Sequence, residues 1–280
     1  MKFNADHSFH IGAQHLRGGM PCQDYALSLT YDNFAYGIVS DGCSSGGKTD
    51  VGARLLAISA GNACSDLEIR DYPLALGRFA MDRAVEAQQA LGLDNGDMLA
   101  TLGYVAIDSI QGVAKLHGDG LIAMSLRDGG LRLWRFEWAD NTPAYLAYGA
   151  DLYRRFIDYH GGNEWATRAY VDEYRIHSDG QVDERRLPIQ LRDGIAGFAV
   201  HMTKADIERA DYVAVFTDGA AQVDGIEWTE VVRALLDFKS TAGDFAKRRL
   251  NRFLKEAADG GRGPLDDIAY AVVHIDHEAA

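Results

Sequence analysis

The sequence is poor in the residues that build covalent scaffolds. Its 280 residues include only three cysteines, Cys22, Cys43 and Cys64, and no two of them have the Cys-x-x-Cys spacing of a zinc or redox pair. So few cysteines form no disulfide framework. We therefore expect a reduced protein of the cytoplasm.

Proline is also scarce, and no linker interrupts the chain. There are five prolines and no proline-rich or Ser/Gly-rich stretch between the periodic segments. A chain of this length can bury a sizeable core as one unit. We expect a single domain over residues 1–280.

Positive charge and long apolar runs are lacking as well. The chain has 28 Lys and Arg against 41 Asp and Glu, a net charge of −13, which disfavours binding to nucleic acid or to an anionic membrane. No run approaches the roughly 18 to 20 apolar residues of a membrane span. Lys2 is followed by no apolar stretch, so the N-terminus does not resemble a signal peptide. The acid excess indicates either general solubility or carboxylates gathered at a cation site.

Apolar patterning predicts an α+β protein. Runs at 25–31 and 34–40, separated only by Asp32-Asn33, predict an antiparallel hairpin. Further strands are expected at 98–108, 113–117, 121–127, 131–137, 169–177, 211–216 and 268–275. Helices are expected at 50–63, 74–91, 150–159, 228–238 and 242–258. The turns between 98 and 137 are too short for helical crossovers, so we expect those four strands to be antiparallel neighbours. The charged cluster 183–186 is expected to face solvent.

Acidic residues recur beside the predicted strands. Asp41-Gly42 and Asp218-Gly219 each follow an apolar strand and a small hydroxyl residue. Asp24, Asp119 and Asp266 also lie next to strands. A buried carboxylate is unfavourable unless it is paired or metal-bound. If these strand ends meet, their oxygens suit Mg²⁺ or Mn²⁺; otherwise each Asp-Gly simply marks a turn.

In their order along the chain, these segments resemble the metal-dependent protein phosphatases, the type 2C serine/threonine phosphatases. Gln23-Asp24 resembles the family's Glu-Asp element, Ser40-Asp41-Gly42 its Asp-Gly-His element, residues 98–102 its Gly-Ser-Thr-Ala strand, Gly118-Asp119-Gly120 its Gly-Asp-Ser turn, Thr217-Asp218-Gly219 its Thr-Asp-Gly element, and Asp266-Asp267-Ile268 its Asp-Asn-Ile element. Residues 12–15 and 21–24 resemble a divergent bacterial-type branch.

The resemblance implies a four-layer α-β-β-α sandwich of two mainly antiparallel sheets flanked by helices, with a variable insert at about 139–205. It implies two Mn²⁺ or Mg²⁺ ions and a bridging water that attacks phosphorus in line. The implied metal ligands are Asp24, Asp41, Gly42 through its carbonyl, Asp218 and Asp266, with Asp119 for a further ion. Asp24, Asp41 and Asp218 would then be catalytic through the metal-activated water. The implied substrate is phosphoserine or phosphothreonine in a protein, opposed by a cognate Ser/Thr kinase system.

Several positions depart from the family pattern. Gln23 replaces a Glu, and Cys43 replaces the His thought to protonate the leaving group, so activity on poor leaving groups would be low. Gln222 replaces the usual partner of Asp119, so a further metal would bind weakly. The phosphate-binding Arg of the family falls at Gly19, which leaves Arg17, His15 and Lys48 as candidates for that role.

Three alternatives remain from the sequence. Residues 42–49 fit the P-loop pattern of nucleotide-binding enzymes, with Asp218 as the Mg²⁺ acid, but a P-loop needs a largely parallel sheet. Cys43 precedes a helix, yet the residue six positions beyond it is Thr49 rather than the Arg of a cysteine phosphatase. The third alternative is a catalytically weak or silent module that binds a phosphoprotein or another partner.

Overall fold

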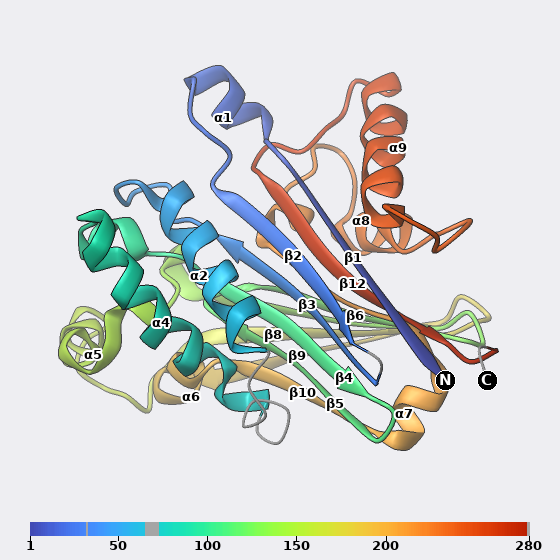
Figure 1. Ribbon diagram of the computed structural model, residues 1–280, viewed down its shortest axis with the longest axis horizontal. Coiled ribbons are helices and arrows are strands. Elements are labelled where there is room, and N and C mark those ends of the chain that lie inside the picture. Colours follow the sequence, from blue (N-terminus) through green and yellow to red (C-terminus); the bar gives the residue numbers. More distant parts are fainter. Residues whose placement is uncertain (32, 65–72, 279–280) are drawn as a thin grey trace.

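The protein is an α-β-β-α sandwich of two antiparallel sheets (Figure 1). The computed structural model describes residues 1–31, 33–64 and 73–278. The larger sheet has seven strands in the order β1 (Lys2–His10), β12 (Ile268–Asp276), β11 (Ala210–Phe216), β6 (Gly120–Leu126), β7 (Leu131–Trp138), β8 (Thr167–Ile176) and β9 (Val182–Gln190). The smaller sheet has five, in the order β10 (Phe198–Thr203), β5 (Gln111–His117), β4 (Leu102–Asp108), β3 (Phe34–Asp41) and β2 (Asp24–Tyr31).

Helices cover the outer face of each sheet. The α-helices are α1 (Ala13–Gly18), α2 (Thr49–Ala63), α4 (Leu76–Leu91), α5 (Gly149–Tyr159), α6 (Leu191–Ala196), α7 (Lys204–Arg209), α8 (Trp228–Leu235) and α9 (Phe245–Asp259). Single 3₁₀ turns are η1 (Pro73–Ala75), η2 (Asn95–Met98), η3 (Ala139–Asn141), η4 (Leu146–Tyr148) and η5 (Asp218–Ala221). Helices α2 and α4 pack on the five-stranded sheet, and α8 and α9 on the seven-stranded one. The predicted fold class is confirmed.

Three apolar clusters hold the four layers together. The central cluster lies between the sheets and includes Val105, Val215 and Ala271. An outer cluster joins α8 and α9 to the large sheet through residues such as Phe216 and Leu250. Another outer cluster joins α2 and α4 to the small sheet. The central strands are therefore buried on both faces, which explains their nearly continuous apolar sequences.

The chain changes sheet at the turn Gly118-Asp119-Gly120. Strands β4 and β5 pair in the small sheet, and β6 and β7 pair in the large one, but β5 and β6 do not pair. The prediction that all four strands are neighbours is therefore wrong at this turn. Gly118 and Gly120 have φ values of 97° and 134°, which side chains rarely adopt, and this backbone leads the chain across to β11 instead of back along β5.

The sequence pattern missed three edge strands and the short helices α1, α6 and α7. Strands β1 and β9 form the two edges of the large sheet, and β10 forms an edge of the small one. Residues 183–186 face solvent as expected, but they lie within β9. Edge strands bury little apolar surface and are often charged, so they show weak alternation. Among the described residues, no helix has the length and apolar character needed to cross a membrane.

Candidate metal centre

Asp24 and Asp41 come together through the β2–β3 hairpin. Asp24 begins β2, Asp41 ends β3, and the two residues pair directly across the ladder. Residues opposite each other in an antiparallel pair point to the same face of the sheet. The Asp41 carboxyl lies in hydrogen-bonding contact with that of Asp24, as donor to it. The short hairpin predicted from the sequence thus creates a pair of acids at one end of the sandwich.

The backbone around Asp41 is held by the segment that precedes β4. The Asp41 N–H donates to Thr101 Oγ1 over 3.1 Å, and the Thr101 N–H donates to the Asp41 carbonyl over 2.8 Å. The next residue, Gly42, forms a bridge with Ala100. A Cβ atom at Gly42 would lie 2.6 Å from the Thr49 carbonyl oxygen, so glycine is needed at this position.

Asp218 reaches the same place from the opposite sheet. It begins η5, and Thr217 alone separates it from the end of β11. The Thr217 hydroxyl donates to Asp24 Oδ2 over 2.6 Å and accepts from the Ala269 N–H over 2.9 Å. Thr217 thereby fastens the ends of β11 and β12 to the start of β2. Gln222 Nε2 donates to Asp218 Oδ2 over 2.8 Å.

Asp119 and Asp266 lie at the margins of this group. Asp119 and Asp218 line one cavity of 260 Å³. Asp266 lies near His15 and Asp267. One possible ligand atom from each of these three residues lies within 4.8 Å of the other two. The structure therefore brings Asp24, Asp41, Asp119, Asp218 and Asp266 to one end of the sandwich.

The electrostatics of these acids favour a bound cation. Burial raises the pKa of Asp24, Asp41 and Asp119 well above the ordinary value for aspartate, and the neighbouring carboxylates raise these pKa values further. Burial, followed by repulsion from Asp266, raises the pKa of Asp218 to about 6. A divalent cation would stabilise the ionised forms of these groups.

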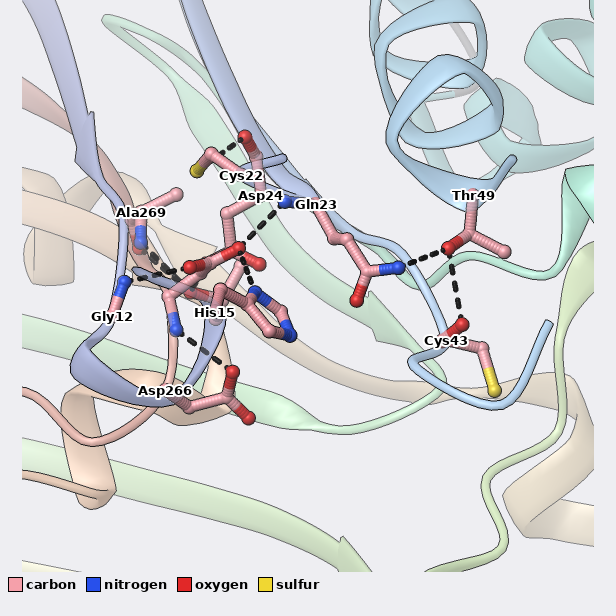
Figure 2. Close-up of polar contacts among 11 residues, drawn as sticks. Gly12, His15, Cys22, Gln23, Asp24, Cys43, Thr49, Asp266 and Ala269 are labelled. Carbon is pink, nitrogen blue, oxygen red and sulfur yellow. Dashed lines mark hydrogen bonds and ion pairs between the residues drawn. The ribbon is translucent and has the colours of Figure 1, made fainter. Parts of the chain in front are cut away.

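Gln23 supplies a further oxygen without a partner. Thr49 Oγ1 donates its proton to the Cys43 carbonyl oxygen over 3.0 Å and accepts from Gln23 Nε2 over 2.8 Å, which fixes the orientation of the amide (Figure 2). Gln23 Oε1 is buried and has no hydrogen-bond partner among the described residues. A buried acceptor of this kind requires a donor, and a metal-bound water would provide one. The residues at this centre thus fit a hydrated divalent metal.

The sequence profile described as protein phosphatase 2C matches residues 11–255. The chain belongs to this family. A search of the curated proteins finds no match to the sequence.

Solved phosphatases share the fold of this protein phosphatase 2C member. The serine/threonine phosphatase Stp1 from Staphylococcus aureus superposes with a TM-score of 0.56 at 10% identity, over 99% of this chain and 96% of that one. The S. agalactiae serine/threonine phosphatase gives 0.53 at 15% identity, over 98% and 100%. The Mycobacterium tuberculosis phosphatase PstP/Ppp gives 0.51 at 14% identity, over 99% and 100%.

The residues predicted to bind phosphate in this protein phosphatase 2C chain lie in different surroundings. His15 is at the edge of the centre, and its Nδ1 lies 2.7 Å from Asp267 Oδ2. Figure 2 shows the His15 ring with this contact dashed. The side chains of Arg17 and Lys48 are exposed. Gly19, where the family has its arginine, has a φ of 64°, a conformation that favours glycine.

The geometry of residues 42–49 does not fit a nucleotide-binding loop. The Lys48 N–H, which would face phosphate in such a loop, donates to Asp97 Oδ1 over 2.6 Å. A Cβ at Gly47 would lie 2.0 Å from the same oxygen. The preceding strand, β3, is antiparallel to both of its neighbours. The protein's own Asp97 thus occupies the anion position of the loop.

Sequence reasoning missed the role of Asp267. Only 2% of this residue is exposed, and its carboxylate accepts from the N–H groups of Gly12 and Gln23 over 2.7 and 2.6 Å, besides its contact with His15. Asp267 therefore joins the start of β12 to the two loops that flank α1. Its signal in the sequence is its place after Asp266, at the Asn of the family's Asp-Asn-Ile element.

Arg135 was missed as well. It lies on β7, lines the cavity of Asp119 and Asp218, and pairs with Glu137 Oε2 at 3.0 Å. Its charge lowers the pKa of both aspartates, in opposition to the effect of burial. The predicted strand 131–137 places it at this end of the sheet, but the cross-strand neighbours that define the cavity come from distant segments.

Proposed function

We propose that this chain is a metal-dependent phosphatase that hydrolyses phosphoserine and phosphothreonine in proteins. The observation that supports this proposal best is the gathering of five aspartates from both sheets at one end of the sandwich, where Gln23 also has a buried, unpartnered oxygen. Membership of the protein phosphatase 2C family supports the same reaction class.

The proposed metal ligands are Asp24, Asp41, the Gly42 carbonyl, Asp218 and Asp266. Two Mn²⁺ or Mg²⁺ ions, when bound, would activate a water for in-line attack and neutralise the phosphoryl oxygens. Gln222 stands where the family has the usual partner of Asp119, and its amide donates to Asp218. We therefore expect Asp119 to bind no further ion tightly. The hydroxyl of Thr217 and the backbone of Thr101 would hold Asp24 and Asp41 in place.

We infer that residues 1–280 act as one phosphatase domain with a variable insert at about 139–205. Its partner would be a phosphoprotein, with a Ser/Thr kinase as the opposing enzyme. The cytoplasmic location remains a prediction from the low cysteine content.

A weak or silent phosphatase-like module is the second candidate. It is favoured by Cys43, which stands where the family has its proton-donating histidine. Cys43 is half-buried, with Sγ 3.2 Å from Ser45 Oγ. Such a module would retain the aspartates of the centre and bind metal, but would not hydrolyse a phosphorylated substrate.

Hydrolysis of a phosphothreonine peptide in the presence of Mn²⁺ tests the proposal. We expect turnover that chelator abolishes and that Asp41→Asn or Asp218→Asn lowers by at least about 100-fold, because even outer-shell changes reduce metal sites about 10- to 100-fold. Asp183→Asn is the matched control, since Asp183 is exposed on β9. Mn²⁺ binding without turnover would favour the silent module, and absence of Mn²⁺ binding would disprove the proposed function.

A further inference from the structure

A second cavity of 360 Å³ lies beside the metal centre. Its walls come from the loop after β3, through Cys43 and Ser45, from η4, through Tyr148, and from α5, through Phe156 and Tyr159. Figure 1 shows α5 at the margin of the molecule, below α4. The volume lies in the roughly 300–1,000 Å³ range of binding pockets, at the lower end. It suits one side chain better than a whole peptide.

The cavity and the metal centre share a wall. Cys43 lines the cavity and follows Asp41-Gly42 directly in the chain. Tyr145, which also lines it, is in side-chain contact with Cys43, and the charges of Asp119 and Asp41 are near enough to raise the pKa of its phenol further above the effect of burial. A substrate side chain bound in the cavity would therefore belong to a residue close in the substrate's sequence to the one whose phosphoryl group is at the metal centre.

The walls offer aromatic surface to a ligand. The ring centroids of Tyr148 and Phe156 are 5.1 Å apart, and those of Tyr145 and Tyr148 are 5.6 Å apart. Tyr159, at the end of α5, is 73% exposed. Large exposed aromatic side chains beside a reactive centre are typical of recognition surfaces. An aromatic or large aliphatic side chain would remove this surface from water and pack against the rings.

The rim of the cavity carries a positive charge. Arg155 lines the cavity and is exposed on α5. An acidic residue next to the bound apolar side chain could pair with its guanidinium. Among the described residues, the lining of this cavity includes Arg155 and no acidic side chain, unlike the centre beside it.

We infer that this cavity is a specificity site that binds one large apolar or aromatic side chain of the phosphoprotein substrate, close in sequence to the phosphorylated residue. The inference rests on the proposed phosphatase function. Tyr148 and Tyr159 form the contact surface, and Arg155 selects an acidic neighbour. None of these three residues belongs to the proposed metal centre.

A peptide series tests the inference. The reference is a phosphothreonine peptide with alanine at every flanking position, and each other peptide carries one phenylalanine between positions −4 and +4. We expect one position to raise kcat/KM by about tenfold or more, because discrimination by an apolar pocket is about 10- to 200-fold. An aspartate beside that phenylalanine should raise kcat/KM further, and Arg155→Ala should remove this second gain.

Variants identify the cavity as the source of the preference. Tyr159→Ser and Tyr148→Ser should remove the gain from phenylalanine and leave kcat/KM for the all-alanine peptide unchanged. Trp165→Ser is the matched control, because Trp165 is 57% exposed and packs against Arg192 outside the cavity. A preference below twofold at every position, or one that survives both tyrosine substitutions, would overturn the inference.

A binding measurement separates this inference from the proposed function. The same peptides, labelled with fluorescein, are titrated with the Asp41→Asn protein and followed by anisotropy. We expect the phenylalanine peptide to bind about tenfold more tightly than the all-alanine peptide even without turnover. Equal Kd values would disprove the specificity site. Failure of the wild-type protein to hydrolyse any peptide would instead count against the proposed function.

Discussion

Thr217 is the residue at which the two sheets meet beside the acids. Its hydroxyl donates to Asp24 from one sheet and accepts from the Ala269 N–H of the other. Only 1% of Thr217 is exposed, so neither partner can turn to water instead. A single hydroxyl thus orients a proposed metal ligand and satisfies a buried backbone donor.

Thr217→Val should therefore affect both metal binding and stability. We expect Mn²⁺ affinity to fall about 10- to 100-fold, as for other residues that orient ligands, and the free energy of unfolding to fall by about 1–3 kcal/mol. Calorimetric titration and urea denaturation measure the two quantities. Thr217→Ser retains the hydroxyl and should stay close to wild type; Mn²⁺ affinity unchanged in the valine variant would show that Thr217 does not position Asp24.

At the scale of elements, helix α2 lies in unusually close contact with the segment η2. A Cβ at Gly52 would lie 1.9 Å from the Asp97 carbonyl oxygen, which is closer than real Cβ contacts. Thr49, in the first turn of the same helix, accepts from Gln23 at the metal centre. The approach of α2 to η2 therefore helps to set the position of Gln23.

Gly52→Ala should destabilise the protein, although alanine normally favours a helix by about 1 kcal/mol over glycine. We expect overpacking to lower the free energy of unfolding by about 1–3 kcal/mol, as measured by urea denaturation, with a loss of Mn²⁺-dependent activity. Gly96→Ala, where a Cβ would meet nothing within 4 Å, should remain within about 0.5 kcal/mol of wild type. A stabilised Gly52→Ala protein would contradict the close approach.

At the scale of the whole molecule, packing one sheet on the other gathers like charges. Asp24 and Asp41 come from the five-stranded sheet, whereas Asp218 and Asp266 come from the ends of the other. Burial and repulsion raise the pKa values of Asp24, Asp41 and Asp218 in the fold, so these ionised acids oppose folding unless a cation is bound. Without a bound cation, the centre therefore lowers the free energy of unfolding, as functional sites often do.

The sign of the pH dependence follows from Asp218, whose pKa of about 6 lies above the ordinary 3.8. A raised carboxyl pKa gives a contribution to stability that is fully present below pH 3.8 and is lost as the pH rises through about 6. In chelator at pH 7.5, Asp218→Asn should therefore have a higher Tm than wild type, and the difference should shrink as the pH falls from 6 toward 4. Because both proteins contain the same buried histidines, the titration of these histidines cancels in the difference between the two Tm values.

Saturating Mn²⁺ should raise the Tm of wild type at pH 7.5 and raise that of Asp218→Asn much less. Scanning calorimetry with and without the ion measures both effects. A wild-type protein more stable than Asp218→Asn in chelator at pH 7.5 would show that repulsion at this centre is negligible.

Short patterns in the sequence were enough to predict the local parts of this protein. The hairpin of β2 and β3, the helix at α4 and the acids at the strand ends follow from short patterns, because a turn, a cap or an apolar period depends on few neighbouring residues. The order of the motifs was sufficient to indicate the α-β-β-α sandwich and the acids Asp24, Asp41 and Asp218. The edge strands β1 and β9 could not be predicted, since they bury too little apolar surface to show alternation.

Which of these parts come into contact depends on the packing of the two sheets against each other. The turn at Asp119 could have returned β6 along β5, but the backbone of Gly118 and Gly120 leads the chain to the other sheet, where β6 pairs with β11. Likewise, no local pattern predicted that Asp267 would bind Gly12 and Gln23, or placed Arg135 beside Asp119. Such contacts join residues far apart in the chain, and their energies depend on the packing of two complete sheets. The fold therefore explains part of the acid excess of the sequence, because it gathers five of these carboxylates at one end of the sandwich.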